Sequence, residues 1–213
     1  MKDLSHYRKS YEKSALTEAS IPGNPIQLFK TWFDEMEVLE GNDEINAMTL
    51  STIGLDGFPK SRIVLLKKFT DEGFIFFTNY NSEKGRAIAA NPSVCLSFFW
   101  GAMERQVIIK GIAEKTPTDI SDIYFESRPL GSRLGAIVSD QSDIIESREW
   151  LDNKLKNLEA QLSDAAIIRP KHWGGYIVKP VEMEFWQGRT NRLHDRIRYQ
   201  AENGDWKFSR LAP

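Results

Sequence analysis

Apolar residues recur at helical spacing near the start of the chain, directly after a helix-capping pair. Asn24 is a preferred N-cap residue, and Pro25 suits the first helical position. The apolar residues that follow are three or four positions apart, as on one face of a helix. The pattern therefore predicts an early amphipathic helix whose buried stripe is Leu28, Phe29, Trp32, Phe33 and Met36.

Runs rich in β-branched and aromatic residues follow, and turn residues separate them. Asp56-Gly57 and Asp71-Glu72-Gly73 are typical of turns between antiparallel strands. A short helix over 82–90 is expected to end at Asn91-Pro92, because the residue before proline avoids the helical region. The predicted strands are 47–53, 61–68, 74–78, 94–99, 105–114, 173–178, 181–187, 192–199 and 206–209.

Between the two groups of strands, residues 117–162 have a helical pattern. Four leucines indicate its buried stripe, namely Leu151, Leu155, Leu158 and Leu162. Strands before and after a helical block, without strand–helix–strand alternation, favour a mainly antiparallel β fold with helices, of the α+β class. We expect a barrel decorated by helices.

Composition excludes several classes of protein. At 213 residues and a formal net charge of −2, the chain suits one domain without a general attraction to nucleic acid. The polar N-terminus and the absence of a long apolar run predict a cytoplasmic protein. Three histidines and one cysteine make a zinc cluster unexpected, and we predict no metal. The lone Cys95 lies in an apolar run, which favours burial over reactivity.

Three potential cations alternate near the C-terminus. If the segment is extended, Arg192, His194 and Arg196 project from one face and could bind an anion. A charged, solvated edge strand would explain them equally well. In the preceding strand, alternation places Val181, Met183 and Phe185 toward the core. Trp186 then lies on the polar face, where a planar ligand, a second subunit or a covering loop could contact it.

Two further groups of residues suit an anionic ligand. Arg62 and Lys67 flank an apolar strand, although their odd spacing places them on opposite faces unless a bulge intervenes. Tyr124 and Arg128 are four residues apart on one helix face, and Ser132 lies four residues further on. Pro129 interrupts the run and is expected to start a new helical turn, so Ser132 would lie near a helix N-terminus, where a phosphate could bind. Ordinary strand-end charges, a surface arginine and a helix cap are the alternatives.

The pair Gln141-Ser142 precedes the last part of the helical region. Serine is a preferred N-cap residue, so this pair is expected to cap the long helix that follows.

Taken together and in this order, these clusters resemble the pyridoxine/pyridoxamine 5′-phosphate oxidase family. The resemblance covers nearly the whole chain, from His6-Tyr7-Arg8 to Arg210-Leu211-Ala212-Pro213. Its most specific segments are Arg62 to Lys67, Glu104-Arg105-Gln106-Val107, Ser127-Arg128-Pro129, Gln141-Ser142, Phe185-Trp186-Gln187-Gly188 and Arg192-Leu193-His194-Asp195-Arg196.

The resemblance implies a homodimeric split β-barrel that holds FMN at the subunit interface. It implies a mobile N-terminal segment, 1–20, and one FMN-binding domain, 21–213, in which about 172–213 serve dimerisation and substrate binding. Residues with a counterpart in the flavin site are Arg62, Ile63, Val64, Leu65, Leu66, Lys67, Phe77, Thr78, Lys84, Gln106, Gln141, Ser142, Trp186 and Arg196.

The resemblance also implies an activity. The expected reaction oxidises pyridoxine or pyridoxamine 5′-phosphate to pyridoxal 5′-phosphate with O2, releasing hydrogen peroxide, and ammonia from the amine. Arg192 and His194 are the implied catalytic residues. The implied substrate-binding residues are Arg8, Lys9, Ser10, Tyr11, Lys67, Tyr124, Arg128, Ser132, Arg192, Leu193 and His194.

One position departs from the family pattern. Members usually have Ser-Arg-Lys where this chain has Ser82-Glu83-Lys84. The family arginine is implied to contact the FMN phosphate, which a carboxylate would repel. We therefore expect either that Glu83 faces solvent or that Arg86, one turn along, replaces the arginine. Two other functions remain compatible with the residues: a split-barrel flavin reductase with another substrate, and a non-catalytic carrier of pyridoxal phosphate.

Overall fold

The computed structural model describes residues 2–39, 44–161 and 167–213. Its strands are all joined by antiparallel pairing into one nine-stranded sheet. The first elements are η1 (Glu18–Ser20), α1 (Pro25–Glu37), β1 (Ala47–Ile53), β2 (Pro59–Leu65), β3 (Lys68–Thr70), β4 (Gly73–Asn79), α2 (Glu83–Ala90), β5 (Ser93–Trp100) and β6 (Arg105–Lys115). The remaining elements are α3 (Thr118–Ser127), α4 (Leu130–Val138), α5 (Arg148–Gln161), β7 (Trp173–Gln187), η2 (Thr190–Arg192), β8 (Asp195–Glu202) and β9 (Asp205–Arg210).

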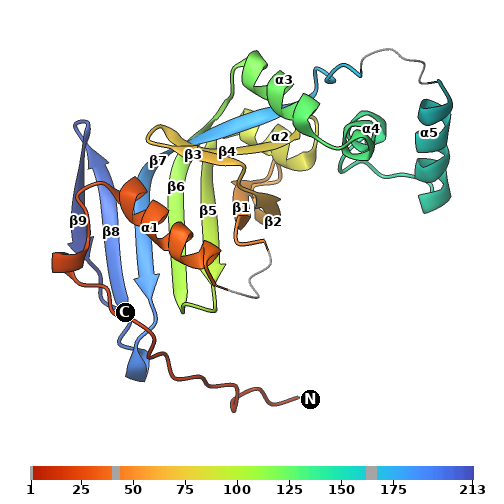
Figure 1. The fold of residues 1–213 in the computed structure, drawn as a ribbon. Coiled ribbons are helices and arrows are strands. Elements are labelled where there is room, and N and C mark those ends of the chain that lie inside the picture. Colours follow the sequence, from red (N-terminus) through yellow and green to blue (C-terminus); the bar gives the residue numbers. More distant parts are fainter. Residues whose placement is uncertain (1, 40–43, 162–166) are drawn as a thin grey trace.

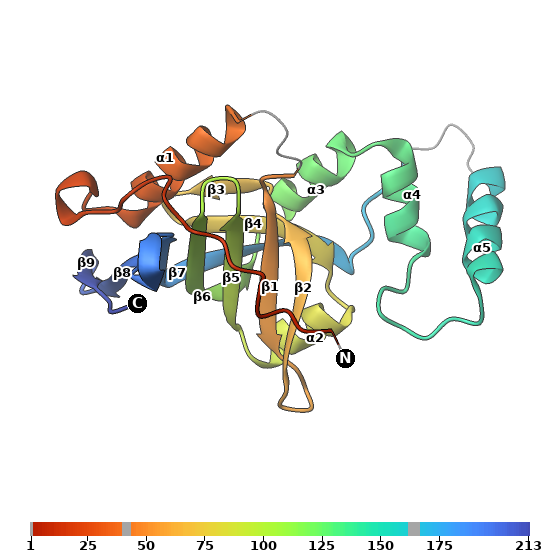
Figure 2. The ribbon, with the colours of Figure 1, turned by 90° about the horizontal axis from the view of Figure 1, so that it is seen from below.

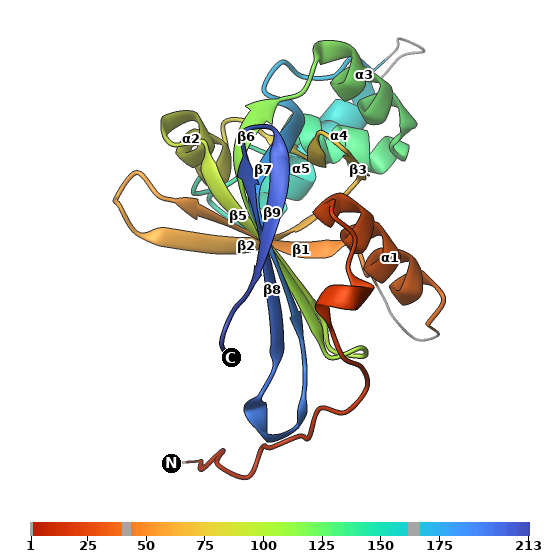
Figure 3. The ribbon, with the colours of Figure 1, turned by 90° about the vertical axis from the view of Figure 1, so that its left-hand side faces the viewer.

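The sheet order is β2-β1-β5-β6-β7-β4-β3, and the β8–β9 hairpin is attached to β7. The first part of β7 pairs with β4 and its last part pairs with β8, so one long strand joins two regions of the sheet. Figures 1 and 2 show α3, α4 and α5 at one end of the molecule and the β8–β9 hairpin at the other. Figure 3 shows the N-terminal segment passing beneath the loop that joins β7 to β8. The predicted antiparallel barrel with helices is confirmed.

Helix α1 covers one face of the sheet and supplies much of the core. As predicted, Asn24 caps it, because its side chain accepts a hydrogen bond from the N–H of Ile26 at 2.8 Å. Phe29 is fully buried, and its ring centroid lies 4.9 Å from Phe74 and 5.2 Å from Phe98. Truncating such a side chain to alanine costs about 3–5 kcal/mol of stability. None of the helices among the described residues has the length and apolar character needed to cross a membrane.

The predicted strand 61–68 was too long. Strand β2 ends at Leu65, and β3 begins at Lys68 after a break. At the break the N–H of Leu66 donates to the carbonyl of Asn46, whereas that of Lys67 donates to Ile75, each at 2.8 Å. The chain thus leaves β1 and joins β4 within two residues. This change of partner turns the corner of the half-barrel.

The predicted strands 173–178 and 181–187 form one strand, β7. Pro180 is accommodated because the register of β6 against β7 shifts between Lys110 and Gly111. A Cβ at Gly111 would lie 2.5 Å from the carbonyl oxygen of Lys179, so only glycine fits there. The shift also turns Val181 outward, with 47% of its surface exposed, against the prediction that it faces the core.

The helical region also differs from the expectation. Helix α5 begins at Arg148, and Ser147 accepts a hydrogen bond from the N–H of Trp150, so Gln141-Ser142 does not cap it. Its leucines Leu151, Leu155 and Leu158 are only half-buried, because α5 packs chiefly on α4. Leu162, the fourth predicted leucine, lies outside the described residues.

The predicted strand 192–199 begins only at Asp195. Residues Thr190–Arg192 form a short 3-10 turn in which Asn191 and Arg192 have φ values of 55° and 62°. Arg192, His194 and Arg196 therefore do not project from one strand face, and the prediction of a shared face was wrong. Arg196 alone belongs to the strand.

Candidate active site

A cavity of about 650 Å³ opens between β2, β4, α3 and α4. Most of its walls consist of residues that the sequence singled out for the cofactor or for a phosphate. The residues that line it are Arg62, Ile63, Val64, Leu65, Lys67, Phe77, Thr78, Asn79, Lys84, Tyr124, Arg128, Pro129, Ser132, Gln141 and Trp173. We call it the first cavity.

The chain break after β2 brings Arg62 and Lys67 to the same cavity despite their odd spacing. Arg62 is held by strand β1, since its Nη1 donates to the carbonyl of Leu50 at 3.2 Å and to Oγ1 of Thr52 at 2.8 Å. The rest of its guanidinium remains available to a ligand. Two cations from one corner of the sheet thus face the same space.

Lys84 adds a third, buried cation in the first turn of α2. Ser82 caps this helix by accepting the N–H of Gly85. The Lys84 Nζ lies 3.3 Å from Oε1 of Gln141, to which Thr78 also donates. Burial, reinforced by the nearby charge of Arg62, lowers the pKa of Lys84 to about 8. An anion in this cavity would raise this pKa and stabilise the charged form.

Aromatic rings form another part of the wall of the first cavity. The ring of Tyr124 stacks on Phe77 with a centroid distance of 3.9 Å, and Trp173 is nearly parallel to both. The guanidinium carbon of Arg128 lies 4.6 Å from the Trp173 ring centroid. The Trp173 ring therefore holds the arginine through a cation–π contact.

Arg128 has a buried donor that none of the described residues satisfies. Its Nη1 lacks a hydrogen-bond partner within the described part of the chain, although it is shielded from solvent. Ser132 lies nearby in the first turn of α4, where free backbone N–H groups favour an anion. A buried donor nitrogen without a partner is costly, so a ligand with acceptor oxygens is expected to complete this site.

A second cavity, of about 480 Å³, lies between the N-terminal segment and the loop before β8. Its walls are Tyr7, Arg8, Lys9, Ser10, Tyr11, Arg189, Asn191, Arg192 and His194. Its residues are entirely different from those of the first cavity. Within one chain, the predicted site is therefore divided between two places.

His194 is oriented by the backbone beside it. Its Nδ1 accepts a hydrogen bond from the N–H of Arg189 at 3.1 Å. Its ring centroid lies 4.6 Å from Trp186 and 5.9 Å from Tyr11. Burial, with a contribution from the charge of Arg192, lowers the pKa of His194. The neutral ring, with its proton on Nε2, is therefore the favoured form.

Three predicted flavin residues form a row across adjacent strands. Gln106 of β6 is opposite Trp186 of β7, which is opposite Arg196 of β8. The Arg196 guanidinium donates to Glu184 at 2.8 Å and to the carbonyl of Ala212 at 2.8 Å. We call these residues the outward row, because their neighbours Phe185 and Ile197 face the core. The outward row does not line the first cavity.

A few predicted residues line neither cavity. Leu66 is buried in the core, while Ser142 and Leu193 are exposed. Conversely, the sequence did not indicate Asn79, Pro129 and Trp173 in the first cavity, or Tyr7, Arg189 and Asn191 in the second. For Trp173, the available signal was an aromatic residue at the start of a predicted strand.

Glu83 does not enter the first cavity. Its carboxylate pairs with Lys60 of β2 at 2.7 Å, and this contact lowers its pKa. Arg86 instead donates to the carbonyl of Asn81 and lies 3.6 Å from Asp143. Glu83 therefore points away from the first cavity, and Arg86, which does not line that cavity either, does not replace the family arginine there.

The chain matches two family models. Residues 35–161 match the model described as pyridoxamine 5′-phosphate oxidase. Residues 173–213 match that described as pyridoxine 5′-phosphate oxidase C-terminal dimerisation region.

Curated relatives match the chain over its full length. The chain is 65% identical over 213 residues to the pyridoxine/pyridoxamine 5′-phosphate oxidase of Flavobacterium johnsoniae, with all of both chains covered. It is 48% identical to that of Pseudomonas putida over 99% of this chain and 98% of the relative.

Two solved structures have folds similar to that of this chain. The crystal structure of PhzG from Burkholderia lata, in complex with tetrahydrophenazine-1-carboxylic acid, has a TM-score of 0.87 and 31% identity. The match covers 96% of this chain and 100% of PhzG. A pyridoxamine 5′-phosphate oxidase-related, FMN-binding protein from Nostoc punctiforme has a TM-score of 0.70 at 13% identity, over 91% and 99% of the two chains.

Proposed function

The chain belongs to the pyridoxamine 5′-phosphate oxidase family, and we propose that it oxidises pyridoxamine and pyridoxine 5′-phosphates to pyridoxal 5′-phosphate with FMN. The observation that carries this proposal is the first cavity, where cations and a buried, unsatisfied arginine donor meet a wall of stacked rings. Such a cavity suits a planar ligand with a phosphate group.

The residues of the first cavity fit FMN. Arg62 and Lys84 supply two cations for its phosphate, and Gln141 and Thr78 supply hydrogen-bonding groups beside them. The segment from Ile63 to Leu65 provides backbone amides and apolar contacts for a flat ring. When bound, FMN supplies a two-electron oxidant that dioxygen can regenerate.

The C-terminal match indicates a homodimer. We propose that each active site joins the first cavity of one subunit to the second cavity and outward row of its partner. This arrangement accounts for the division of the predicted site in a single chain. It also gives a role to Trp186 and Arg196, which line neither the first nor the second cavity of their own subunit.

The remaining residues would bind and orient the substrate. Arg128, Ser132, Tyr124 and Lys67 surround its phosphate, and the free Nη1 of Arg128 gains an acceptor. From the partner, Arg192 and the Nε2–H of His194 would contact the pyridine ring and its substituents, while Arg8 to Tyr11 would exclude water.

The overall chemistry balances with dioxygen as the final oxidant. The alcohol carbon loses two electrons and two protons to become the aldehyde, and dioxygen takes them up as hydrogen peroxide. The amine loses the same number, and water then replaces nitrogen as the aldehyde oxygen, which releases ammonia. Neutral His194 would act in this reaction as a hydrogen-bond donor rather than as a base.

The proposal is tested by adding FMN to the purified protein and then each phosphorylated substrate in air. We expect bound FMN, pyridoxal 5′-phosphate and an equal amount of hydrogen peroxide. Bound FMN without turnover of either substrate would favour a reductase with another substrate. Binding of pyridoxal 5′-phosphate without FMN binding would favour a carrier. Either of these two results would overturn the oxidase proposal.

A further inference from the structure

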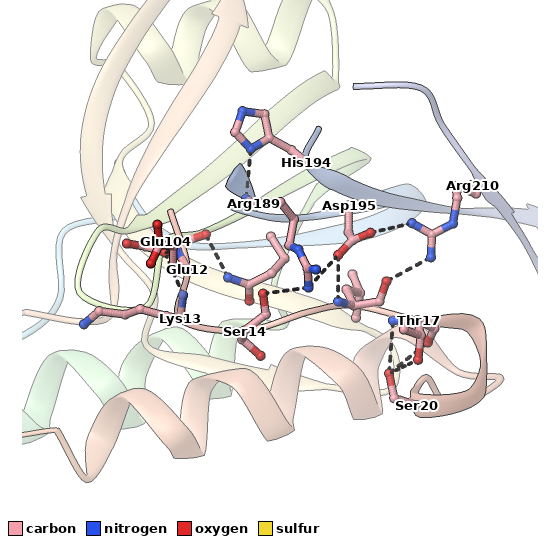
Figure 4. A network of polar contacts seen from close by, with 12 residues as sticks. Glu12, Lys13, Ser14, Thr17, Ser20, Glu104, Arg189, His194, Asp195 and Arg210 are labelled. Atoms are coloured by element: carbon pink, nitrogen blue, oxygen red, sulfur yellow. Dashed lines mark hydrogen bonds and ion pairs between the residues drawn. The ribbon is translucent and has the colours of Figure 1, made fainter. Parts of the chain in front are cut away.

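The two ends of the chain meet beside the second cavity. Arg210, near the C-terminus, contacts Glu18 with two nitrogens, at 2.6 and 2.8 Å from the two carboxylate oxygens. Its Nη1 donates to Oδ1 of Asp195 at 2.7 Å, and its Nη2 donates to the carbonyl of Leu16 at 2.9 Å. One guanidinium therefore joins the N-terminal segment to the start of β8, as Figure 4 shows in part.

Asp195 holds the same segment directly. Its Oδ2 accepts the N–H of Leu16 at 3.0 Å, while its Oδ1 is occupied by Arg210. The side chain of Leu16 is 3% exposed and belongs to the hydrophobic core. Because Asp195 directly follows His194, the carboxylate that binds the N-terminal segment is next to a residue of the second cavity.

A second attachment lies farther toward the N-terminus. Glu104 is almost fully buried, and its Oε2 accepts the N–H groups of Glu12 and Lys13 at 2.9 and 3.1 Å. Between its two attachments, the segment is guided by Arg189, whose Nη1 donates to the carbonyl of Ser14 at 3.3 Å. The backbone from 12 to 16 is therefore fixed at several points (Figure 4).

The fixed backbone places Tyr11 against Trp186 and His194. The Tyr11 ring lies edge-on to Trp186, with centroids 5.7 Å apart, and 5.9 Å from His194. A Cβ at position 188 would lie 2.8 Å from the Cβ of Tyr11, so Gly188 permits this close approach. A shift of the segment would therefore move one wall of the second cavity.

We infer that Arg210, with Glu18 and Asp195, forms a clamp that positions the N-terminal segment over the second cavity. Arg210 is a positioning residue that acts through Leu16 and Asp195 on Tyr11 and His194. The expected effect of the clamp on KM rests on the proposed function. It also accounts for the C-terminal tetrapeptide, since Leu211 and Ala212 bond to Arg196 while Arg210 closes the clamp.

The clamp is tested with Arg210→Gln in the FMN-loaded dimer. Amide hydrogen exchange of the peptide containing Leu16 is expected to be about tenfold faster, because Asp195, which accepts the N–H of Leu16, is no longer held in place by Arg210. The KM for pyridoxamine 5′-phosphate is expected to rise about tenfold, while kcat changes less than about twofold. FMN affinity, measured by fluorescence, is expected to stay the same.

Lys207→Gln is the matched control. Lys207 lies in the same hairpin and pairs with Glu202 at 2.6 Å, away from the N-terminal segment. It is expected to change neither exchange nor KM. Glu18→Gln is the second variant, for use if Arg210→Gln does not fold. It removes the charge of one clamp partner and is expected to shift both readouts in the same direction, to a smaller extent.

Two results would overturn the inference. Unchanged exchange at Leu16 would show that Arg210 does not hold the segment. Faster exchange with an unchanged KM would show that the clamp does not position the site. Because exchange does not depend on turnover, a lack of oxidase activity in the unmodified protein would contradict the proposed function without affecting this first readout.

Discussion

The backbone N–H of Arg189 donates a hydrogen bond to Nδ1 of His194, and this contact determines what the imidazole can do. Protonation of Nδ1 would place two N–H groups against each other. Together with burial and the charge of Arg192, the contact favours the neutral ring. His194 therefore presents an N–H at Nε2, which suits a substrate oxygen.

We predict that His194 titrates below about pH 6.5 in the folded protein. The unfolded chain takes up this proton near the ordinary histidine pKa, whereas the folded chain takes it up only at lower pH. This group therefore destabilises the fold progressively as pH falls below about 6.5. NMR titration of the ring, assigned with His194→Gln, measures the pKa. A value at or above 6.5 would contradict the account.

Arg192→Met is expected to lower kcat/KM for pyridoxamine 5′-phosphate by about a hundredfold, because it removes a cation that faces the substrate. FMN affinity is expected to change less than about twofold, since Arg192 lies outside the first cavity. Steady-state kinetics and FMN titration measure the two effects. Arg148→Met, at an exposed arginine of α5, is the control. Equal losses of turnover and FMN affinity would indicate a structural role for Arg192.

Arg128→Met is expected to reduce the preference for phosphorylated substrates by at least about tenfold, because a buried charged donor loses its phosphate partner. The measurement compares kcat/KM for pyridoxamine 5′-phosphate with that for pyridoxamine. Dephosphorylated substrate should be affected little. If both substrates lose activity to the same extent, Arg128 does not recognise the phosphate.

FMN affinity is expected to fall as pH rises from about 7 to about 9, because Lys84 loses its charge in this range. The unliganded protein has a Lys84 pKa of about 8, and a bound phosphate would favour the charged form. Fluorescence titration of FMN at several pH values provides the measurement. Lys84→Met should bind more weakly and show a flatter profile. An identical pH profile in this variant would assign the effect to another group.

Glu83→Gln is expected to change FMN affinity by less than about threefold at physiological salt, because exposed charges are screened there. Glu83 pairs with Lys60 and does not line the first cavity, so its charge is already compensated. FMN titration is again the measurement. Tightening of more than about tenfold would show that Glu83 does repel the cofactor phosphate.

Local patterns predicted most of the fold, because capping and alternation act within a few residues. Asn24, Ser82 and the alternating strands β5 and β6 illustrate this. The features that local patterns did not predict depend on pairing between strands that are distant in sequence. The break at Leu66 and Lys67 follows from a change of partner strand, and the exposure of Val181 follows from a register shift. Neither feature has a signal in its own segment.

The candidate site was predicted through resemblance more than through residue patterns. The comparisons confirm the family, and the first cavity brings together most of the residues that the resemblance assigned to FMN and phosphate. The strand-face argument for Arg192, His194 and Arg196 was wrong, because Asn191 and Arg192 adopt left-handed conformations that end the extended run. The role of Arg210 depends on contacts between the two chain ends, which no local pattern indicates.

The central claim is that each active site combines the first cavity of one subunit with the second cavity of its partner. Heterodimers of an Arg128→Met subunit and an Arg192→Met subunit, isolated with two different affinity tags, test it most directly. One of their two sites would carry both changes and the other neither. We predict that they recover about half of the unmodified activity, whereas the Arg128→Met and Arg192→Met homodimers keep at most about a tenth and about a hundredth of it, respectively. Heterodimers no more active than the parents would contradict the claim, because each site would then lie within one chain.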